Sequence, residues 1–355
     1  MVRNVLRSLK YLGIQPESAQ PSVVAILALA PSIVAGMVFF RLIALEMLVV
    51  AAGAAIAAYA ASRLRGEPLQ TVPVLPALVG VAFIGAGASL AWAVVVAVVA
   101  VGLELARDRY TPGARLQTGL VAYSLVWLLA RGGPATYVSP DSATPLAMPG
   151  FGVPHFAAGQ GPIDPVRLYV GNVAGPVFAT STLAVAIGAA WFWYARRLSL
   201  LVVLTFLVGV TVPMMLAGWS PGYELLIGPV WFAAALLLAD RRDLPRSTIG
   251  RPLVGFAAGA GAMWLRARGY AIESTIAAMA AVQVGVVAVQ GVGWLMRNLG
   301  HVRARLHERR RPAEERPALP PAGPDLLRSV EVGPAADHEL VSPRTDADHL
   351  YRREA

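Results

Sequence analysis

The chain has 355 residues, of which 56% are hydrophobic and only 14% are charged, and its mean hydropathy is +0.59. A soluble domain of this length cannot bury so much apolar surface, so the composition excludes a soluble protein and indicates an integral membrane protein. The net charge of +9 comes almost wholly from arginine, since Lys10 is the only lysine. In a membrane protein an excess of arginine usually reflects the orientation of the chain in the bilayer and its contact with lipid. The expected partner is therefore the lipid bilayer and not nucleic acid.

The residues that usually bind metals are scarce. The chain has no cysteine and five histidines, of which only His155 lies outside the C-terminal segment that begins at His301. Disulfides are therefore excluded, and no metal or haem site built from Cys and His is expected.

The apolar segments predict an all-α membrane protein, because a helix needs about 20 apolar residues to cross a bilayer. Residues 1–21 have no apolar core beside their basic charge and no cleavage site, so we interpret them as a cytoplasmic N-terminal segment with an amphipathic part on the membrane surface. Ten predicted spans follow, with the ranges 22–40, 42–61, 71–87, 89–106, 116–130, 171–194, 198–217, 223–239, 252–268 and 274–296.

The basic residues predict the orientation of these spans, because Lys and Arg concentrate in short cytoplasmic connections. With the N-terminus inside, the inner segments contain fourteen of them, namely Arg3, Arg7, Lys10, Arg63, Arg65, Arg107, Arg109, Arg115, Arg196, Arg197, Arg241, Arg242, Arg246 and Arg251. The outer segments contain five, namely Arg41, Arg131, Arg167, Arg266 and Arg268. The split predicts a multi-pass protein of the cell inner (plasma) membrane with both termini in the cytoplasm and a long outer loop at 131–170.

The outer loop divides the spans into two halves, 22–130 and 171–296. Because each half has five spans, the second half runs in the opposite orientation, as in the inverted repeats that form a site at mid-membrane. The third span of each half contains proline, at Pro73 and Pro76 and at Pro229. These prolines indicate either interrupted helices around a site or ordinary kinks, and both interpretations stay open.

The composition changes after Arg297 to proline, arginine and acidic residues with little apolar periodicity. Residues 297–355 are therefore expected to form a disordered cytoplasmic tail. Its first part, Arg303 to Arg311, is interpreted as a solvated run of charge, with contact to anionic lipid head groups as the alternative.

Two acidic residues near the ends of spans have expected partners. Asp240 ends the eighth span, and we expect it to pair with Arg241, Arg242 or Arg251 at the inner surface. Glu104 lies near the end of the fourth span, where exposure to head groups is expected.

Three stretches of the chain contain motifs: SATPLA at 142–147, LYVGNVAGPVFATSTLAVAIGAAWF at 168–192, and the segment 232–280 with its ADRRDLPRSTIGR sequence. As a set they resemble one family, which comprises the RnfD proteins of Rnf electron-transport complexes and the NqrB proteins of the sodium-translocating NADH:quinone reductase. The first is similar to the family's Ser-Gly-Ala-Thr-Pro-Leu segment, and the second to its Gly-Asn-x-x-Gly-x-x-Gly-Glu-Thr-Ser helix entry. With the order of spans and loops, the likeness covers residues 20–297.

The resemblance implies a flavin-carrying membrane subunit that relays electrons across the bilayer. In the family the threonine of the first motif is esterified to the phosphate of FMN, and Thr144 is the matching residue here. Riboflavin is a second candidate flavin. The implied partners are other membrane and flavin-bearing redox subunits, and coupling to Na⁺ or H⁺ movement stays open. No catalytic residue is assigned, and the chain would be an enzyme only as a subunit of a membrane oxidoreductase or translocase.

The first motif by itself allows two interpretations. Pro145 restricts Thr144 to extended geometry, which leaves the threonine hydroxyl available for a flavin phosphoester beside Ser142. Alternatively, the Ser-Ala-Thr-Pro sequence forms a turn in which the side-chain oxygens satisfy local amides.

The second motif supplies the other candidate flavin-binding residues. Gly171, Asn172 and Gly175 open the sixth predicted span, and Thr180 and Ser181 follow one turn later. Glycines let a backbone approach a ring or phosphate closely, and the three polar side chains offer neutral hydrogen-bonding groups. Small residues at a helix–helix contact explain the same pattern without a ligand.

Departures from the family pattern support a rival function. The family's Ser-Gly is Asp141-Ser142 here, its acidic residue six positions before the threonine is Val138, and its Gly-Glu pair is Phe178-Ala179. The lost glutamate removes a buried acidic group that could have served ion coupling. The alternative is therefore a small-solute transporter or channel on the same inverted-repeat fold.

Overall fold

The computed structural model describes residues 21–64, 73–111, 114–140, 165–218, 225–245, 247–270 and 272–310. These segments are helical with irregular connections, and their β-structure consists of two isolated bridges, Gly85 with Pro176 and Leu198 with Asp240. By its internal contacts the chain divides into two units, Met1–Trp294 and Leu295–Ala355. The candidate site belongs to the first unit.

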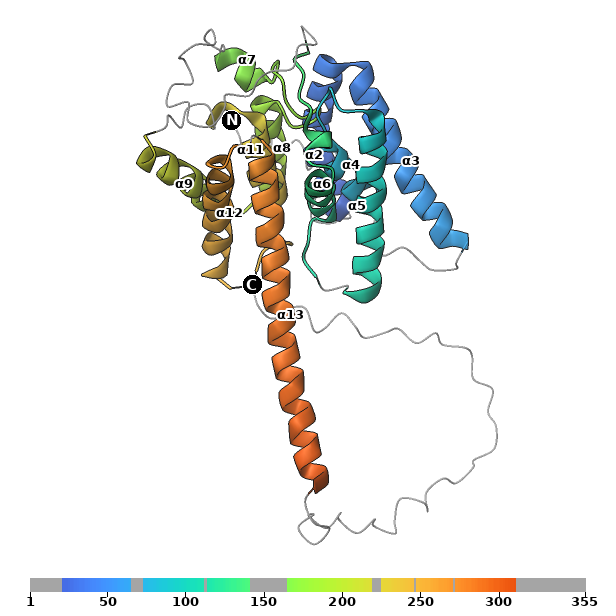
Figure 1. The fold of residues 1–355 in the computed structure, drawn as a ribbon, viewed down its shortest axis with the longest axis vertical. Coiled ribbons are helices and arrows are strands. Elements are labelled where there is room, and N and C mark those ends of the chain that lie inside the picture. Colours follow the sequence, from blue (N-terminus) through green and yellow to red (C-terminus); the bar gives the residue numbers. More distant parts are fainter. Residues whose placement is uncertain are drawn as a thin grey trace, which may run out of the picture. The chain divides into compact units, whose positions relative to one another are not determined.

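The helices follow the order of the predicted spans (Figure 1), and each predicted range overlaps a helix. The helices before the long loop are α2 (Pro21–Phe40), α3 (Leu42–Leu64), α4 (Val74–Ala82), α5 (Leu90–Tyr110) and α6 (Thr118–Leu129), with the 3-10 turn η1 (Gly133–Ala135) after them. Those after the loop are α7 (Pro165–Val170), α8 (Thr182–Tyr194), α9 (Leu200–Leu216), α11 (Gly228–Trp231), the π-helix η2 (Phe232–Leu238), α12 (Gly250–Arg266) and α13 (Glu273–Arg310).

Four of the described helices are long and apolar enough to cross a membrane. They cover Pro21–Phe40, Leu42–Leu64, Leu90–Tyr110 and Glu273–Val292. Shorter apolar helices cover Thr118–Leu129, Thr182–Tyr194, Leu200–Leu216 and Gly228–Leu238. A helix satisfies its backbone hydrogen bonds internally, which lipid requires, so the chain is a multi-pass membrane protein.

The start of the sixth predicted span was wrong. We expected a helix from residue 171, but α8 begins at Thr182, and residues 171–181 form an irregular segment. Gly171 has φ +98°, a conformation that ends the preceding helix α7. Ser181 is the N-cap of α8, because its hydroxyl accepts a hydrogen bond from Ala184 N at 3.1 Å.

The prolines of the third and eighth spans start helices. Pro73 is the residue before α4 and Pro76 lies in its first turn, while Pro229 lies in the first turn of α11. The first turn has no intrahelical partner for its N–H groups, so proline costs little there. The irregular backbone instead follows α4, which ends at Ala82 and not near the predicted residue 87.

The last helix is longer than predicted. α13 runs to Arg310, whereas the tenth span was expected to end at 296 and to be followed by a disordered tail. Residues 297–310 are rich in Arg, Leu and His with one Ala and one Glu, most of which tolerate a helix, and contain no proline. The predicted N-terminal segment and the tail from residue 311 lie outside the described residues.

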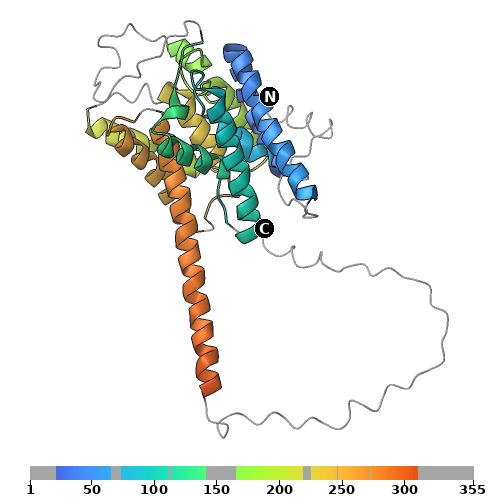
Figure 2. The same ribbon diagram turned by 45° about the vertical axis from the view of Figure 1, so that its right-hand side comes forward.

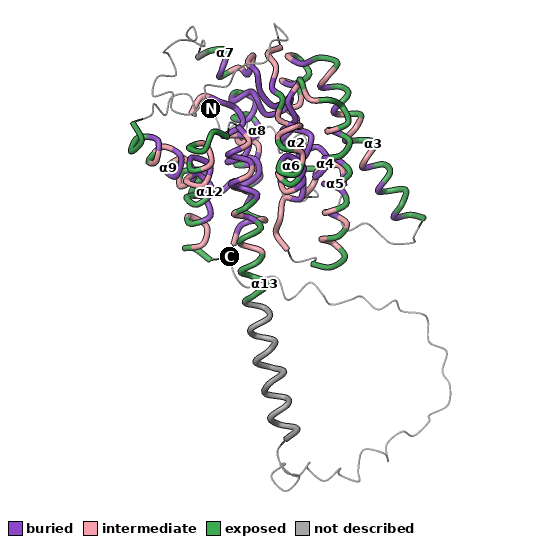
Figure 3. Tube along the Cα trace, viewed as in Figure 1, coloured by how far each residue is buried: buried purple, intermediate pink, exposed green. Residues whose placement is uncertain are grey.

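Helix packing buries the middle of the bundle. α9 packs along α12, α2 packs against α8, and α4 packs against both α5 and α6. α4 and η2 are buried along almost their whole length, whereas α3 exposes much of its surface (Figure 3). Glycine permits the closest approach, because a Cβ at Gly259 of α12 would lie 2.2 Å from the carbonyl oxygen of Phe206 on α9.

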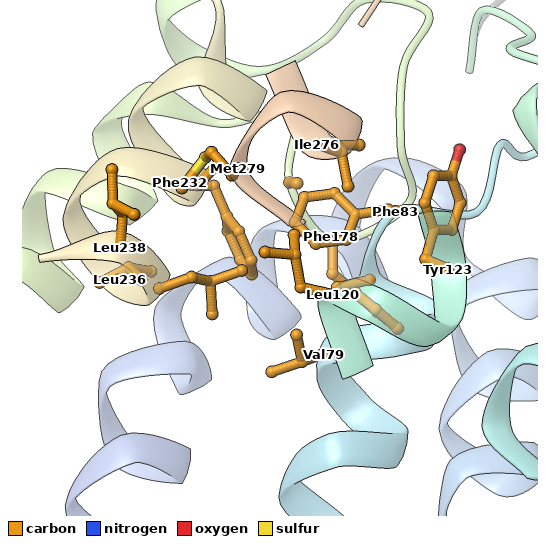
Figure 4. Close-up of a cluster of buried hydrophobic side chains, with 14 of the residues drawn as sticks. Val79, Phe83, Leu120, Tyr123, Phe178, Phe232, Leu236, Leu238, Ile276 and Met279 are labelled. Atoms are coloured by element: carbon orange, nitrogen blue, oxygen red, sulfur yellow. The ribbon is translucent and has the colours of Figure 1, made fainter. Parts of the chain in front are cut away.

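A cluster of buried side chains joins the two halves of the bundle. Figure 4 shows Phe83 beside Phe178, with Phe232 and Met279 on the opposite side from Tyr123. The rings of Phe83 and Phe232 have centroids 5.3 Å apart and stand nearly edge to face, a favourable aromatic geometry. Since Phe83 precedes the long loop and Phe232 follows it, this apolar core ties the halves together.

Two glycines offer a test of the contact between α2 and the irregular segment before α8. A Cβ at Gly36 would lie 2.5 Å from both Phe178 Cδ1 and Val177 O, whereas a Cβ at Gly53 of α3 would meet nothing within 4 Å. Gly36→Ala should therefore destabilise the protein by about 1–3 kcal/mol through overpacking. Gly53→Ala, the control, should be neutral or stabilise by up to ~1 kcal/mol. Unfolding in detergent measures both, and equal effects would contradict the contact.

Candidate functional site

Three irregular segments meet at the end of the bundle that we call the loop end, where the connections after α4, α6 and α7 lie (Figures 1 and 2). They are residues 83–89, 134–138 and 171–181. Their backbone hydrogen bonds run from Gly85 N to Pro134 O (3.0 Å), from Gly87 N to Thr136 O (3.0 Å), from Val177 N to Ile84 O (2.9 Å) and from Phe178 N to Ala82 O (3.3 Å). These bonds satisfy backbone groups that lipid could not satisfy, so an irregular backbone can be placed here.

The predicted flavin-binding residues that the structure describes all lie in the segment 171–181. This segment folds back on itself, since a Cβ at Gly171 would lie 2.6 Å from Ser181 Cα and a Cβ at Gly175 would lie 2.7 Å from Thr180 Cγ2. The backbone N–H of Asn172 donates to Arg167 O at 3.0 Å. Glycines thus bring the two ends of the segment together.

The two hydroxyl residues of this segment are buried, with Thr180 2% and Ser181 4% exposed. Ser181 Oγ accepts the capping hydrogen bond from Ala184 N, which leaves the hydroxyl hydrogen able to donate. The other two candidates, Ser142 and Thr144, lie outside the described residues.

A buried tyrosine pair at the loop end was missed by the sequence reasoning. Tyr123 of α6 and Tyr137 after η1 have hydroxyl oxygens 3.2 Å apart, and both side chains are buried. Burial, then the neighbouring Tyr123 and the charge of Glu273, raise the pKa of Tyr137 well above its ordinary value. Glu273, the first residue of α13, therefore brings a carboxylate to this end of the bundle. No local pattern could have revealed the group, because one tyrosine lies on α6, the other follows η1, and Glu273 lies far along the chain.

Asp240 lies at the other end of the bundle, which we call the arginine end, and its ion pair differs from the predicted one. Arg197 donates to both Asp240 carboxylate oxygens and also to Pro21 O, and the Arg197–Asp240 pair is almost completely buried. The expected partner Arg242 donates its backbone N–H to Asp240 Oδ1 at 3.2 Å. A β-bridge between Leu198 and Asp240 places the connection between α8 and α9 beside the connection between η2 and α12. Arg197, although distant in sequence from Asp240, therefore forms the ion pair.

Glu104 is buried, contrary to the expected exposure to head groups, with 5% of its surface exposed. Its Oε1 accepts a hydrogen bond from Arg107 Nη2 at 2.6 Å, and its Oε2 accepts one from Thr118 Oγ1 at 2.6 Å. The carboxylate is stable in this position because a charge partner and a hydroxyl satisfy both oxygens.

The connection between α5 and α6 is held by residues that follow the long loop. The backbone N–H of Gln117 donates to Gln283 Oε1 of α13 at 3.1 Å, and its side-chain amide donates to Asp243. Arg115 Nη1 donates to Leu244 O at 2.8 Å. The arginine end is therefore a polar network that links the two halves, separated by the apolar core from the loop end.

The chemistry available differs between the two ends. The loop end offers glycine backbone, buried hydroxyls and the tyrosine pair, groups that can hold a neutral aromatic ring or a phosphate. Among the described residues there is no group of three His, Cys, Asp or Glu side chains placed to hold a metal ion.

Comparison with known proteins connects this arrangement to a family. The family described as NQR2, RnfD, RnfE matches residues 15–282, which include both ends of the bundle. No individual curated protein matches the chain. Because the family match covers most of the chain, the protein belongs to the NQR2, RnfD, RnfE family of membrane subunits of electron-transport complexes.

Proposed function

We propose that the protein is a flavin-carrying membrane subunit that relays electrons between redox partners on the two sides of the bilayer. The observation that supports this most strongly is the clustering at the loop end of Gly171, Gly175, Thr180 and Ser181, residues of the motif that resembles the family's Gly-Asn-x-x-Gly helix entry. Their closeness arises from the fold of the segment 171–181 and not from helical spacing.

The residues present at the loop end fit an FMN group. Buried hydroxyls at Thr180 and Ser181 offer hydrogen bonds without burying a charge, and flavin oxygens and nitrogens accept such bonds. Arg131 and Arg167 are the arginines nearest in sequence before and after Thr144, and a cation close to Thr144 would offset the negative charge of a flavin phosphate and of Asp141. When bound, the flavin supplies the redox chemistry, and the protein positions it.

The rest of the chain indicates why partner subunits are needed. The chain has no cysteine, so it cannot hold an iron–sulfur cluster with cysteine ligands. The apolar core that contains Phe83 and Phe232 separates the loop end from the arginine end. Electrons would therefore enter and leave through redox groups of other subunits, membrane-embedded or flavin-bearing.

We also propose that the two halves are inverted repeats. The turn between the first two helices of each half contains an arginine with positive φ, Arg41 at 47° and Arg196 at 55°. The third helix of each half is short and has proline in its first turn, at Pro76 and Pro229. Shared features at matching positions support a common origin of the halves.

The orientation proposed for this fold is testable because the chain has no cysteine. We expect Gly150→Cys to react with an impermeant thiol reagent from outside the cell, and Pro320→Cys only after the membrane is opened. The physical reason is the excess of arginine in the segments assigned to the cytoplasm. Labelling of both positions from the same side would contradict the ten-span arrangement.

A small-solute transporter or channel remains the second candidate function, because Phe178-Ala179 replaces the family's Gly-Glu pair and the loop end thereby loses an acidic side chain. One experiment separates the two functions. The full chain is purified from hosts with and without a flavin transferase, and flavin absorbance and intact mass are measured. A tightly held flavin supports the electron-transfer subunit, and its absence from both preparations supports the transporter.

A further inference from the structure

Asp243 joins the two halves at the arginine end through a hydrogen bond to a neutral partner, the side-chain amide of Gln117. It lies on the connection between η2 and α12, and its backbone N–H donates to Asp240 O at 3.0 Å. Its Oδ2 accepts a hydrogen bond from Nε2 of Gln117, which lies on the connection between α5 and α6. The residue as a whole is half-buried and lies on a connection between helices, so protons from water can reach this part of the chain.

Charged groups from three parts of the chain interact with this carboxyl. Asp240 and Arg242 share its own connection, Arg197 comes from the connection between α8 and α9, and Arg107 comes from α5. Burial and the negative charge of Asp240 raise the pKa of Asp243 to about 7, against the opposing effects of the Gln117 hydrogen bond, Arg197 and Arg107. The arginines are already engaged, Arg197 with Asp240 and Arg107 with Glu104.

The partner of Asp243 suits both forms of a carboxyl group. An ionised carboxylate accepts from the Gln117 amide nitrogen, and a protonated carboxyl can donate to the Gln117 amide oxygen once the amide has rotated. Asp240, by contrast, is held by a guanidinium that only donates. The hydrogen bond between Asp243 and Gln117 can therefore persist when Asp243 is protonated, but the amide then accepts the bond and the carboxyl donates it.

We propose that Asp243 is a proton-binding site at the arginine end, and that Gln117 transmits its protonation state to the other half of the bundle. The ligand is the proton, taken up from the aqueous face near α12. The site does not depend on whether the loop end holds a flavin, so the two proposals can fail separately.

The direction of the pH effect follows from linkage. The folded protein binds this proton more tightly than an unfolded chain, in which an aspartate titrates near pH 4. The stabilisation by protonation is therefore complete below about pH 4, falls as the pH rises, and is lost once the pH passes about 7. Asp243→Asn, which is neutral at every pH, should remove this part of the pH dependence and make the protein more stable than wild type at pH 8.

Infrared spectroscopy of the full chain in detergent tests the site directly. The C=O stretch of a protonated carboxyl should disappear with a midpoint near pH 7 in wild type, shift on labelling with ¹³C-aspartate, and be absent in Asp243→Asn. Gln117→Leu should raise the midpoint by about one pH unit, because the charge-assisted hydrogen bond that Gln117 donates to the ionised form is stronger than the bond that it can accept from the protonated form. Glu46→Gln, which changes an exposed acid on α3, should leave the band unchanged.

Two results would overturn the proposal. One is the absence of any aspartate band that titrates between pH 5 and 9 in the labelled wild type, which requires no variant to fold. The other is a titrating band that survives in folded Asp243→Asn, because the proton would then belong to another carboxyl. An unchanged midpoint in Gln117→Leu would contradict the role of Gln117 while the site itself stands.

Discussion

Thr144→Ala is expected to abolish covalent flavin in the protein made together with a flavin transferase. If the proposed function holds, wild type should gain the mass of one FMN-phosphoryl group, because Thr144 would supply the hydroxyl for the ester and a following proline favours extended geometry. Intact mass spectrometry and in-gel flavin fluorescence measure the modified fraction. Thr136→Ala is a matched control, because it removes a threonine hydroxyl of the loop end that already has its own partner, Gly133 O.

The sequence around Thr144 should limit the modified fraction. Asp141 stands three residues before Thr144, so its carboxylate would repel a flavin phosphate attached there, and like charges repel more strongly in a protein loop than in bulk water. Asp141→Ser together with Ser142→Gly should therefore raise the modified fraction of the wild-type chain. An unmodified mass in both proteins, without tightly held flavin absorbance, would reject the flavin site and favour the transporter.

Asp240→Ala is expected to lower the free energy of unfolding by about 3–5 kcal/mol, because it leaves the guanidinium of Arg197 buried without its charge partner. Replacing both residues, with Arg197→Met and Asp240→Leu, should recover most of this loss. Apolar side chains of similar volume remove the cost of burying charge. Denaturant unfolding in detergent provides the comparison.

Arg241→Ala is the control for this pair. Arg241 is adjacent in sequence and exposed, so its removal should change the free energy of unfolding by no more than about 0.5 kcal/mol. If Asp240→Ala costs as little as Arg241→Ala, then the Arg197–Asp240 pair does not stabilise the fold. If the double variant is as unstable as Asp240→Ala, then the loss comes from the Pro21 contact of Arg197 or from packing.

The sequence by itself determined the class of the protein and the order of its helices. Composition indicated a membrane protein, and the apolar segments located α2, α3 and α5 almost to their ends, because lipid requires long uninterrupted apolar helices. The motifs identified the family, which the match over residues 15–282 confirmed. They also selected residues of the segment 171–181, which the structure brings together.

Only the tertiary structure decided which polar groups are buried and what they contact. Helical periodicity could not show that 171–181 is irregular, since its conformation depends on backbone hydrogen bonds to the segment 83–89. It also could not pair Asp240 with Arg197 or Asp243 with Gln117, because these partners lie on connections far apart in the chain. A buried charge or amide needs a partner in space, and spatial neighbours across a bundle leave no pattern in one sequence.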